Sequence, residues 1–308
     1  MSRLNAMMEQ YKHNSTPSNK KESSNKTKYD ENNYFGTRLE VGINTAQKKV
    51  RIIEPKGENE TPFVETMGHK KKVDGKWKTF MCPKHEDGSK CPFCEARDIL
   101  LAEGTPEAKK QAAEYSAKKM YIVKLIDREN PEHGVKFWRF NHHYKNAGTF
   151  DKIYAASSAL PANEDPFSSA SGRDMIISIS RDGANSVVTG INFDYSQSPL
   201  EANSELATTW KKTADEKTWR DVFSVKPYDY LEIIVRGGSP IWKKNETGEG
   251  GKWIDKAELE TKSSTEPTDD FSSELSIGNT KENVSMTQAP QSLVPDSNES
   301  DEDDDLPF

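Results

Sequence analysis

The sequence has little of what marks membrane and secreted proteins. Only 33% of its 308 residues are hydrophobic, and no apolar run approaches the roughly 18 residues of a membrane-spanning helix. The first ten residues lack the apolar segment of a signal peptide. Cysteine is scarce too, because the chain has three, which cannot pair off evenly in disulfides. We therefore expect a protein of a reducing compartment, neither embedded in a membrane nor held together by disulfides.

Charge is divided unevenly along the chain, whose formal net charge is −7. Residues 261–308 contain twelve acidic and two basic residues, whereas residues 1–260 contain 41 basic and 38 acidic ones. A mildly basic body followed by a strongly acidic tail favours a negatively charged partner. It also favours a tail that competes with this partner or recruits others.

Composition divides the chain into three parts. Residues 1–33 are polar and rich in lysine, without apolar periodicity, and we expect a flexible basic arm. Residues 34–260 carry the apolar patterns of a folded core. Residues 261–308 have too few apolar residues to bury, so we expect a disordered acidic tail.

The core is predicted to belong to the α+β class and to consist mainly of β-strands. Short runs of alternating apolar residues, joined by turn signals and interrupted by helical stretches, favour a small β-barrel with helical insertions. Strands are predicted within 41–53, 62–68, 70–73, 76–81, 120–126, 135–140, 174–180, 186–195 and 228–236. Helices are predicted at 95–103, 105–119, 153–159 and 199–217.

The three cysteines indicate a metal site. Cys82, Cys91 and Cys94 have the spacing Cys-x8-Cys-x2-Cys, and the last pair forms a knuckle in which two thiolates converge on one ion. A closed tetrahedral Zn²⁺ site needs a fourth ligand. His85, between the cysteines, and His69, upstream of them, are both available, and spacing alone slightly favours His85. The chain lacks a His-Glu-x-x-His pattern, so we expect one structural zinc ion and not a catalytic one.

The strand Val135–Phe140 combines aromatic and cationic residues. Alternation places Val135, Phe137 and Arg139 on one face, and Lys136, Trp138 and Phe140 on the other. Rings that stack on bases, next to cations that neutralise phosphates, are typical of proteins that bind single-stranded nucleic acid. The alternative for each ring is packing in the core. Further candidates of the same two kinds are Lys49, Arg51, Lys124, Tyr144, Phe193 and Tyr195.

Together these stretches resemble the T-even-type phage single-stranded DNA-binding (helix-destabilising) proteins. The resemblance covers roughly residues 40–235. The resemblance is carried by segments that follow one another in the same order as in that family, namely 50–55, 62–69, 75–77, 82–94, 121–127, 135–140, 151–153 and 182–185.

The resemblance implies an OB-fold barrel with a zinc-binding insertion, at about residues 62–119, and a cationic cleft lined by aromatic rings. It transfers the role of zinc histidine to His69, with His85 as the alternative, and the role of cleft arginine to Arg51. The aromatic and basic strand of the family corresponds to Phe137, Trp138, Arg139 and Phe140. The family uses a basic N-terminal arm for cooperativity, so the resemblance also implies cooperative self-association on DNA.

The C-terminal tip resembles that of bacterial single-stranded DNA-binding proteins, where an acidic run ending in Pro-Phe docks on replication and repair enzymes. Carboxylates suit a basic rim, and a terminal phenylalanine suits a pocket beside a cation. The expected partner-binding residues are Asp303, Asp304, Asp305, Leu306, Pro307 and Phe308.

The expected function is a non-enzymatic protein that coats single-stranded DNA during phage replication, recombination and repair in the host cytoplasm. Its expected partners are a polymerase and a primase, helicase or helicase loader, and no membrane. One alternative is an RNA-binding or transcription accessory protein, since OB barrels accept either nucleic acid. Two others are a metal-dependent nuclease that uses His142 and His143, and a zinc-stabilised scaffold that binds only proteins.

Overall fold

A computed structural model of the chain describes residues 31–57, 60–143, 148–245 and 250–263. The expected basic arm up to residue 30, the residue Tyr144 and the acidic tail from residue 264 lie outside the described residues. No helix of the described part is long and apolar enough to cross a membrane.

Strands and helices follow one another along the described chain. The strands are β1 (Tyr34–Phe35), β2 (Thr45–Ile52), β3 (Phe63–Val73), β4 (Lys76–Met81), β5 (Lys118–Asp127), β6 (Val135–Asn141), β7 (Met175–Asp182), β8 (Asn185–Phe193), β9 (Pro240–Lys244) and β10 (Gly251–Asp255). The α-helices are α2 (Pro83–Glu86), α3 (Pro92–Glu103), α4 (Pro106–Glu114), α5 (Thr149–Ser158), α6 (Ser204–Glu216), α7 (Trp219–Val222), α8 (Tyr228–Val235) and α9 (Lys256–Ser263). Two 3₁₀ turns, Glu31–Asn33 and Pro131–His133, complete the described elements.

One sheet dominates the described chain. Its strands lie in the order β1-β6-β5-β2-β7-β8, and β3 branches from β5 and pairs with β4 on its other side. Apart from the short parallel pair β1–β6, neighbouring strands are antiparallel. The expected mixed α+β class with mainly sheet is thereby confirmed. The pairings of the described strands do not close into a ring, so a closed barrel is not confirmed.

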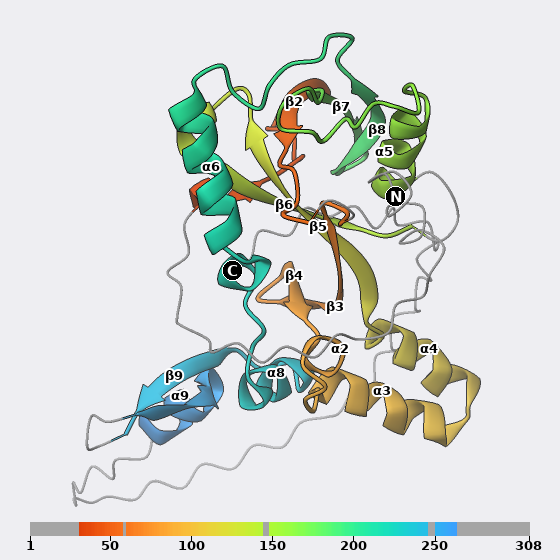
Figure 1. Cartoon of the computed structure of the whole chain (residues 1–308). Coiled ribbons are helices and arrows are strands. Elements are labelled where there is room, and N and C mark those ends of the chain that lie inside the picture. The colour runs from red at the N-terminus through yellow and green to blue at the C-terminus, as the bar shows by residue number, and fades with distance from the viewer. Residues whose placement is uncertain (1–30, 58–59, 144–147, 246–249, 264–308) are drawn as a thin grey trace, which may run out of the picture.

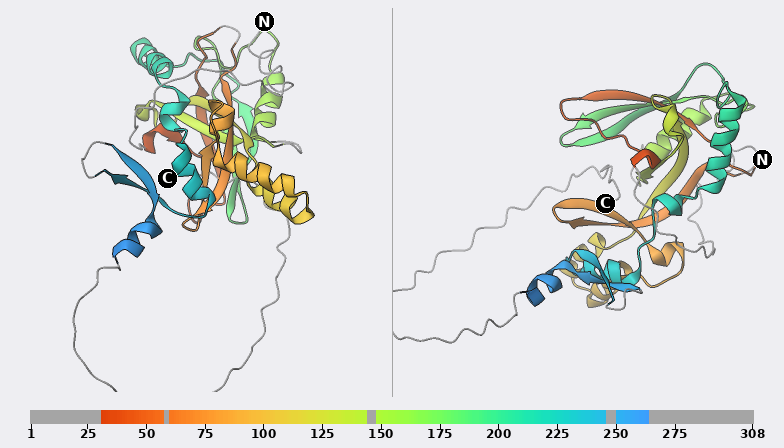
Figure 2. Two further views of the ribbon diagram at one scale, coloured as in Figure 1. Left: turned by 90° about the horizontal axis from the view of Figure 1, so that it is seen from below. Right: turned by 90° about the vertical axis from the view of Figure 1, so that its left-hand side faces the viewer.

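The molecule has two lobes connected by long strands (Figure 1). The upper lobe contains β2, β6, β7 and β8 with α5 and α6, and the lower lobe contains α2, α3, α4, α8 and β9. Strands β3 and β5 run between the lobes, and the β3–β4 hairpin projects between them in the side view of Figure 2. The lower lobe therefore depends on these strands for its position.

Local sequence explains the turns and helix ends that build this arrangement. Asp74 and Gly75 both have positive φ, 52° and 79°, which is the backbone that an Asp-Gly hairpin turn requires. Thr105 caps α4, since its hydroxyl accepts a hydrogen bond from the Ala108 N–H at 3.1 Å, and Pro106 follows as the first helical residue. Both elements match the expectation from sequence.

Three apolar cores stabilise the fold. The first lies in the upper lobe and gathers Tyr121, Val123 and Leu125 of β5 with residues of β6 and β7. The second lies on the opposite face of β5 and is covered by α6 through Trp210 and by the end of α7 through Val222 and the following Phe223. The third, in the lower lobe, surrounds the three cysteines and is described with the metal centre below.

The alternation predicted for the aromatic strand β6 is correct, but both of its faces are buried. Phe137 is 0% exposed in the second core, and Trp138 is 1% exposed in the first. β6 lies between β1 and β5, and apolar layers cover both sides of the sheet at this point. The prediction that Phe137 and Trp138 are stacking platforms for bases is therefore wrong, because their rings are not accessible.

One prediction near the end of the core is wrong. Residues 228–236 were expected to form a strand, but Tyr228–Val235 is helix α8, with Leu231 and Ile234 buried one turn apart in the third core. A short apolar run does not distinguish strand from helix, and packing decides between them. The β9–β10 hairpin that follows was not anticipated at all.

Burial of Trp138 predicts a large loss of stability when its ring is removed. We expect Trp138→Ala to lower the free energy of unfolding by about 3–5 kcal/mol, because it leaves a cavity in the first core. Urea denaturation measures this, with Trp77→Ala as the control: Trp77 is 46% exposed and should cost about 1 kcal/mol or less. Equal losses in the two variants would contradict the assignment of Trp138 to the core.

Candidate metal centre and nucleic-acid interface

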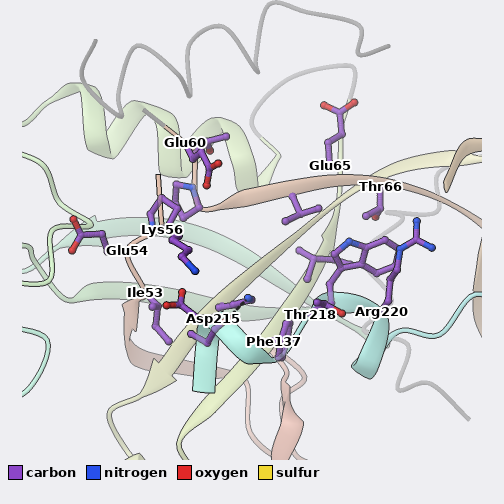
Figure 3. A pocket seen from close by; sticks show the side chains of 18 of the residues that line it. Ile53, Glu54, Lys56, Glu60, Glu65, Thr66, Phe137, Asp215, Thr218 and Arg220 are labelled. Carbon is purple, nitrogen blue, oxygen red and sulfur yellow. Dashed lines mark hydrogen bonds between the residues drawn. The ribbon is translucent and has the colours of Figure 1, made fainter. Parts of the chain in front are cut away.

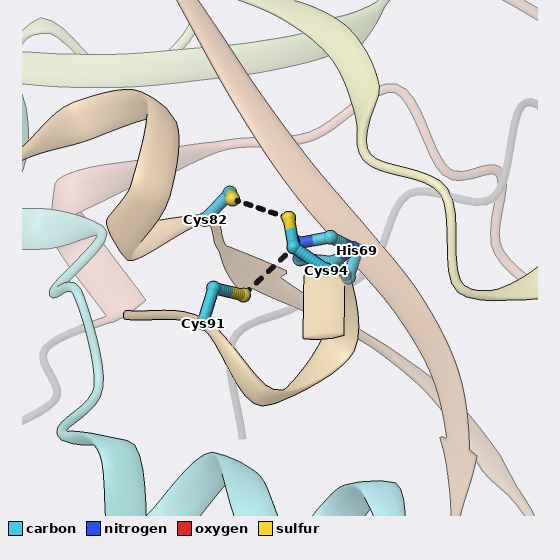
Figure 4. A group of neighbouring side chains, drawn as sticks. All are labelled: His69, Cys82, Cys91 and Cys94. Atoms are coloured by element: carbon cyan, nitrogen blue, oxygen red, sulfur yellow. Dashed lines mark hydrogen bonds between the residues drawn. The ribbon is translucent and has the colours of Figure 1, made fainter. Parts of the chain in front are cut away.

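Four buried side chains from separate parts of the lower lobe converge on one point (Figure 4). His69 lies within β3, Cys82 precedes α2, and Cys91 and Cys94 lie at the start of α3. Their nitrogen and sulfur atoms all lie within 4.8 Å of one another. This cluster could hold one metal ion.

The hairpin explains how distant residues meet. In the β3–β4 register His69 pairs with Phe80, so the chain returns beside the histidine just before Cys82. The Cys82 N–H then donates to the Met67 carbonyl at 2.9 Å, which holds this cysteine against β3. Cys91 is the N-cap of α3, and Pro92 begins that helix, so Cys94 lies in its first turn.

The spacing of the donor atoms fits a tetrahedral ion. The His69 Nε2 lies 3.4 Å from the Cys91 Sγ and 3.7 Å from the Cys94 Sγ, and the Cys82 and Cys94 sulfurs are 3.6 Å apart. With Zn–S of about 2.3 Å and Zn–N of about 2.0 Å, a tetrahedron separates two sulfurs by about 3.8 Å and sulfur from nitrogen by about 3.5 Å. Three thiolates and one imidazole, all buried, are the donor set of a closed structural site.

Neighbouring groups orient the histidine. Its Nδ1 lies 2.9 Å from the Tyr115 carbonyl, so Nδ1–H donates there and Nε2 faces the sulfurs. Its ring also stacks on Phe93, with centroids 4.7 Å apart and planes at 9°. His85 is outside the cluster and exposed on α2, so the alternative that His85 completes the site is wrong.

The thiols influence one another strongly. Hydrogen bonding from Cys82, and then from Cys94, holds the pKa of the Cys91 thiol far below its ordinary range, while the pKa of Cys82 is raised by its hydrogen bond to Cys91. A cation that binds here would displace the thiol protons, because thiolates are the ligand form of cysteine.

The face of the β3–β4 hairpin opposite the metal cluster is cationic and carries an exposed ring. Residues 70–78 contain five lysines, of which Lys70 and Lys72 lie on this face by alternation, whereas Lys71, Lys76 and Lys78 lie on the face of His69. His69, Val73 and Phe80 point into the third core, so the alternate residues Lys72 and Trp77, which pair directly across the hairpin, lie on the other face. Lys72 is exposed and Trp77 is 46% exposed, so a cation and a ring lie together at the surface.

Residues 44–229, more than half of the chain, match a family model described as gp32 DNA binding protein like. The chain belongs to the gp32-like DNA-binding protein family. A search of curated proteins finds no match. The family expected from sequence is thus confirmed, and with it a DNA-binding protein.

Several residues of this gp32-like protein that were predicted to contact DNA are buried and bond to other residues of the chain instead. Arg51 is 0% exposed, and its guanidinium donates to Asp174 and to the carbonyls of Ser168 and Ser198. Burial lowers the pKa of this arginine. The expectation of an accessible cleft arginine is wrong, because Arg51 ties β2 to two loops.

Two lysines are engaged in a similar way. Lys136 is buried and its ammonium donates to Asp127 at 3.1 Å, so the prediction that it is free to bind phosphate is wrong. Lys124 is half-buried, donates to the Ala214 carbonyl and lies 5.8 Å from the centroid of the Phe137 ring. Burial lowers its pKa.

The remaining candidates keep some exposure, and their contact with DNA stays a prediction. Lys49 has 44% of its side chain exposed and donates to Asp194 at 2.6 Å, which places it beside Phe193 and Tyr195. Tyr195 is 95% exposed, and Phe193 is half-buried. Arg139 and Phe140 are half-buried at the end of β6.

The gp32-like protein also has a cavity of about 750 Å³ between the β2–β3 connection, β3, β5 and the α6–α7 segment (Figure 3). Its floor includes Ile122 and Phe137. Its three strongly basic lining residues are Lys56, Lys124 and Arg220, and its acidic ones are Glu54, Glu60, Glu65, Glu86 and Asp215. Acids outnumber strong bases, so this cavity does not suit a phosphate chain.

Of the two candidate histidines, only His69 should be needed for metal binding, together with the three cysteines. We expect His69→Ala and Cys91→Ser to lose the bound metal, because each removes one of four donors, and to unfold more easily as metal binding contributes to folding. His85→Ala should keep one metal ion per chain. Elemental analysis of the purified variants measures this, and loss of metal in His85→Ala with retention in His69→Ala would reverse the assignment.

Glu86 should make stability depend on pH. Burial raises its pKa to about 7 from an ordinary 4.5, while its carboxylate accepts the Met67 N–H at 3.0 Å. Between these two pH values the folded state binds more protons than the unfolded state, so stability falls as pH rises through the window.

Glu86→Gln removes this titration and keeps an oxygen for the Met67 N–H. We expect the variant to match the wild type near pH 5 and to be more stable by about 1–3 kcal/mol at pH 8. Chemical denaturation at the two pH values measures the difference. Parallel profiles for the two proteins would show that the pKa of Glu86 is not raised.

Proposed function

We propose that this protein binds and coats single-stranded DNA during phage DNA replication, recombination and repair, and that it has no catalytic activity of its own. The observation that carries the proposal is the gp32-like family match over residues 44–229. Binding would be largely independent of base sequence, because stacking and phosphate contacts carry little sequence information.

The order of the strands supports an OB-type barrel as the DNA-binding core. β6, β5, β2, β7 and β8 lie side by side in this order and share one apolar core. Helix α5 lies between β6 and β7 in sequence and packs on β8. A five-stranded and partly open barrel of this kind is a recurrent platform for oligonucleotides.

The geometry supports zinc as the ion in the metal centre. His69, Cys82, Cys91 and Cys94 would hold it, and its chemistry would be to cross-link β3 to α3. All four donors come from this chain and are buried, which favours a structural role over a catalytic one. Among the described residues, no second group of His, Cys, Asp and Glu side chains suits a metal, which disfavours the metal-dependent nuclease.

The surface that we assign to DNA is the outer face of the β3–β4 hairpin. Lys70, Lys72 and Trp77 lie there, opposite the face that contacts the metal centre. The lysines would neutralise phosphates, and the indole would stack on a base. The accessible group of Lys49 and Tyr195 offers the same two chemistries in the upper lobe.

Recruitment of a polymerase, primase or helicase loader through residues 303–308, and self-association through the N-terminal arm, remain predictions from the sequence. Both segments lie outside the described residues. Action in the host cytoplasm follows only from the proposed role in phage DNA metabolism.

Binding of labelled oligo-dT, followed by fluorescence anisotropy at several salt concentrations, tests the proposal. We expect Trp77→Ala to weaken binding by between about 5-fold and 100-fold, as stacking contributes about 1–3 kcal/mol per base. Replacing Lys70 and Lys72 by alanine should lower the slope of log affinity against log salt by about 1.4.

The matched control replaces Lys109 and Lys110, which are exposed on α4, and should leave affinity and slope close to those of the wild type. No binding of oligo-dT by the wild type would refute the proposed function. Tighter binding of a matched RNA oligonucleotide would favour the RNA-binding alternative instead.

A further inference from the structure

The β9–β10 hairpin lies beyond residues 44–229, so the family match does not account for it. Its strands pair in register with Trp242 directly opposite Trp253, which places both rings on one face. Trp242 is 40% exposed. A large aromatic ring at the surface of a hairpin of this kind requires an explanation.

Trp242 belongs to a continuous series of aromatic rings in contact. Trp242 meets Trp253 with centroids 5.3 Å apart, and Trp253 meets Tyr230 of α8 at 4.8 Å and 90°. Tyr230 in turn lies 6.2 Å from Phe80, whose ring faces the metal centre. The exposed indole is thus positioned by packing, and a positioned ring loses little further conformational entropy when a base stacks on it.

The backbone beneath the ring is adapted to it. A Cβ atom on Gly251 would lie 2.8 Å from Cε2 and 2.9 Å from Cζ2 of Trp242, so the indole lies against the glycine where a side chain would otherwise be. This contact leaves one edge of the ring fixed on the hairpin. The remaining exposed area faces solvent.

Exposed lysines lie on both faces of the hairpin. Lys244 shares the face of Trp242, whereas Lys243 and Lys252, which pair with each other, lie on the opposite face. No ion pair engages them within the part of the chain that the structure describes. The sequence also places Glu246 and Glu249 between the two strands, so the ring, more than net charge, would have to supply the affinity.

The hairpin is connected to the proposed DNA-binding surface. The Ser239 hydroxyl, one residue before β9, donates to the Asp74 carboxylate at 2.7 Å. Asp74 is the first turn residue of the β3–β4 hairpin, which carries Trp77. The two exposed tryptophans therefore belong to two hairpins that this hydrogen bond connects, and Figure 1 shows α8 beside β9 in the lower lobe.

We propose that the β9–β10 hairpin is a second contact for single-stranded DNA, in which Trp242 stacks on a base while Lys244, on the same face, approaches a neighbouring phosphate. This inference rests on the proposed function and extends the DNA path from the β3–β4 hairpin past residue 229. Its occupant is a single strand, because an exposed ring and an exposed cation share one face there, and these side chains stack on bases and neutralise phosphates.

The test uses the full-length protein and oligo-dT of increasing length, from about 4 to about 16 nucleotides. We expect Trp242→Ala to bind the longest oligonucleotides about 5-fold or more weakly and the shortest ones as tightly as the wild type, because only long strands reach both hairpins. The slope of affinity against salt should hardly change, since the variant removes a ring and no charge.

Two further variants isolate the ring. Trp242→Phe should recover most of the affinity, and Leu101→Ala, which removes an exposed apolar side chain from α3, should have no effect. Thermal melting of each variant checks that the hairpin substitution leaves the core folded.

The outcomes separate this inference from the proposed function. If the wild type binds no oligo-dT, the proposed function fails, and this inference fails with it. If Trp77→Ala weakens binding but Trp242→Ala binds every length like the wild type, only the second contact is overturned. A loss that Trp242→Phe does not recover would also overturn it, since stacking would not be the cause.

Discussion

The convergence of His69 with three cysteines is the constraint on which the lower lobe depends. Three of the eight buried members of the third core are the cysteines themselves. An ion held by the four donors would join β3 to α3 and would add to the apolar packing of this core. The direction of the β3–β4 hairpin follows from this cluster.

The two accessible rings, Trp77 and Trp242, are held in place by packing on the inner side of their hairpins. Trp77 projects from a hairpin whose inner face is bound to the metal centre, and Trp242 rests on rings that lead back to Phe80 and Phe93. Stacking on a base then costs little ordering of the protein. Under the proposed function, an ion in this cluster would contribute to affinity for DNA by holding the β3–β4 hairpin in place.

Patterns with a local cause were readable from sequence, and patterns with a distant cause were not. Asp74-Gly75 predicts its turn because the backbone angles are a property of those two residues. The alternation predicted along β6 was also correct. Alternation does not show which layers cover a strand, however, and Phe137 and Trp138, on opposite faces of β6, are both buried. Tyr228–Val235 forms a helix because this conformation places Leu231 and Ile234 on one face, where both pack in the third core.

The sequence by itself determined three things. They are the three cysteine donors of the metal site, the division into a basic body and an acidic tail, and the family. Each of these depends on residue type and order alone. Only the tertiary structure decided between His69 and His85, because spacing counts residues while coordination depends on where β3 carries the imidazole. It also decided that Arg51 is an internal tie and that Trp77 and Trp242 are accessible, since burial is set by elements distant in the chain.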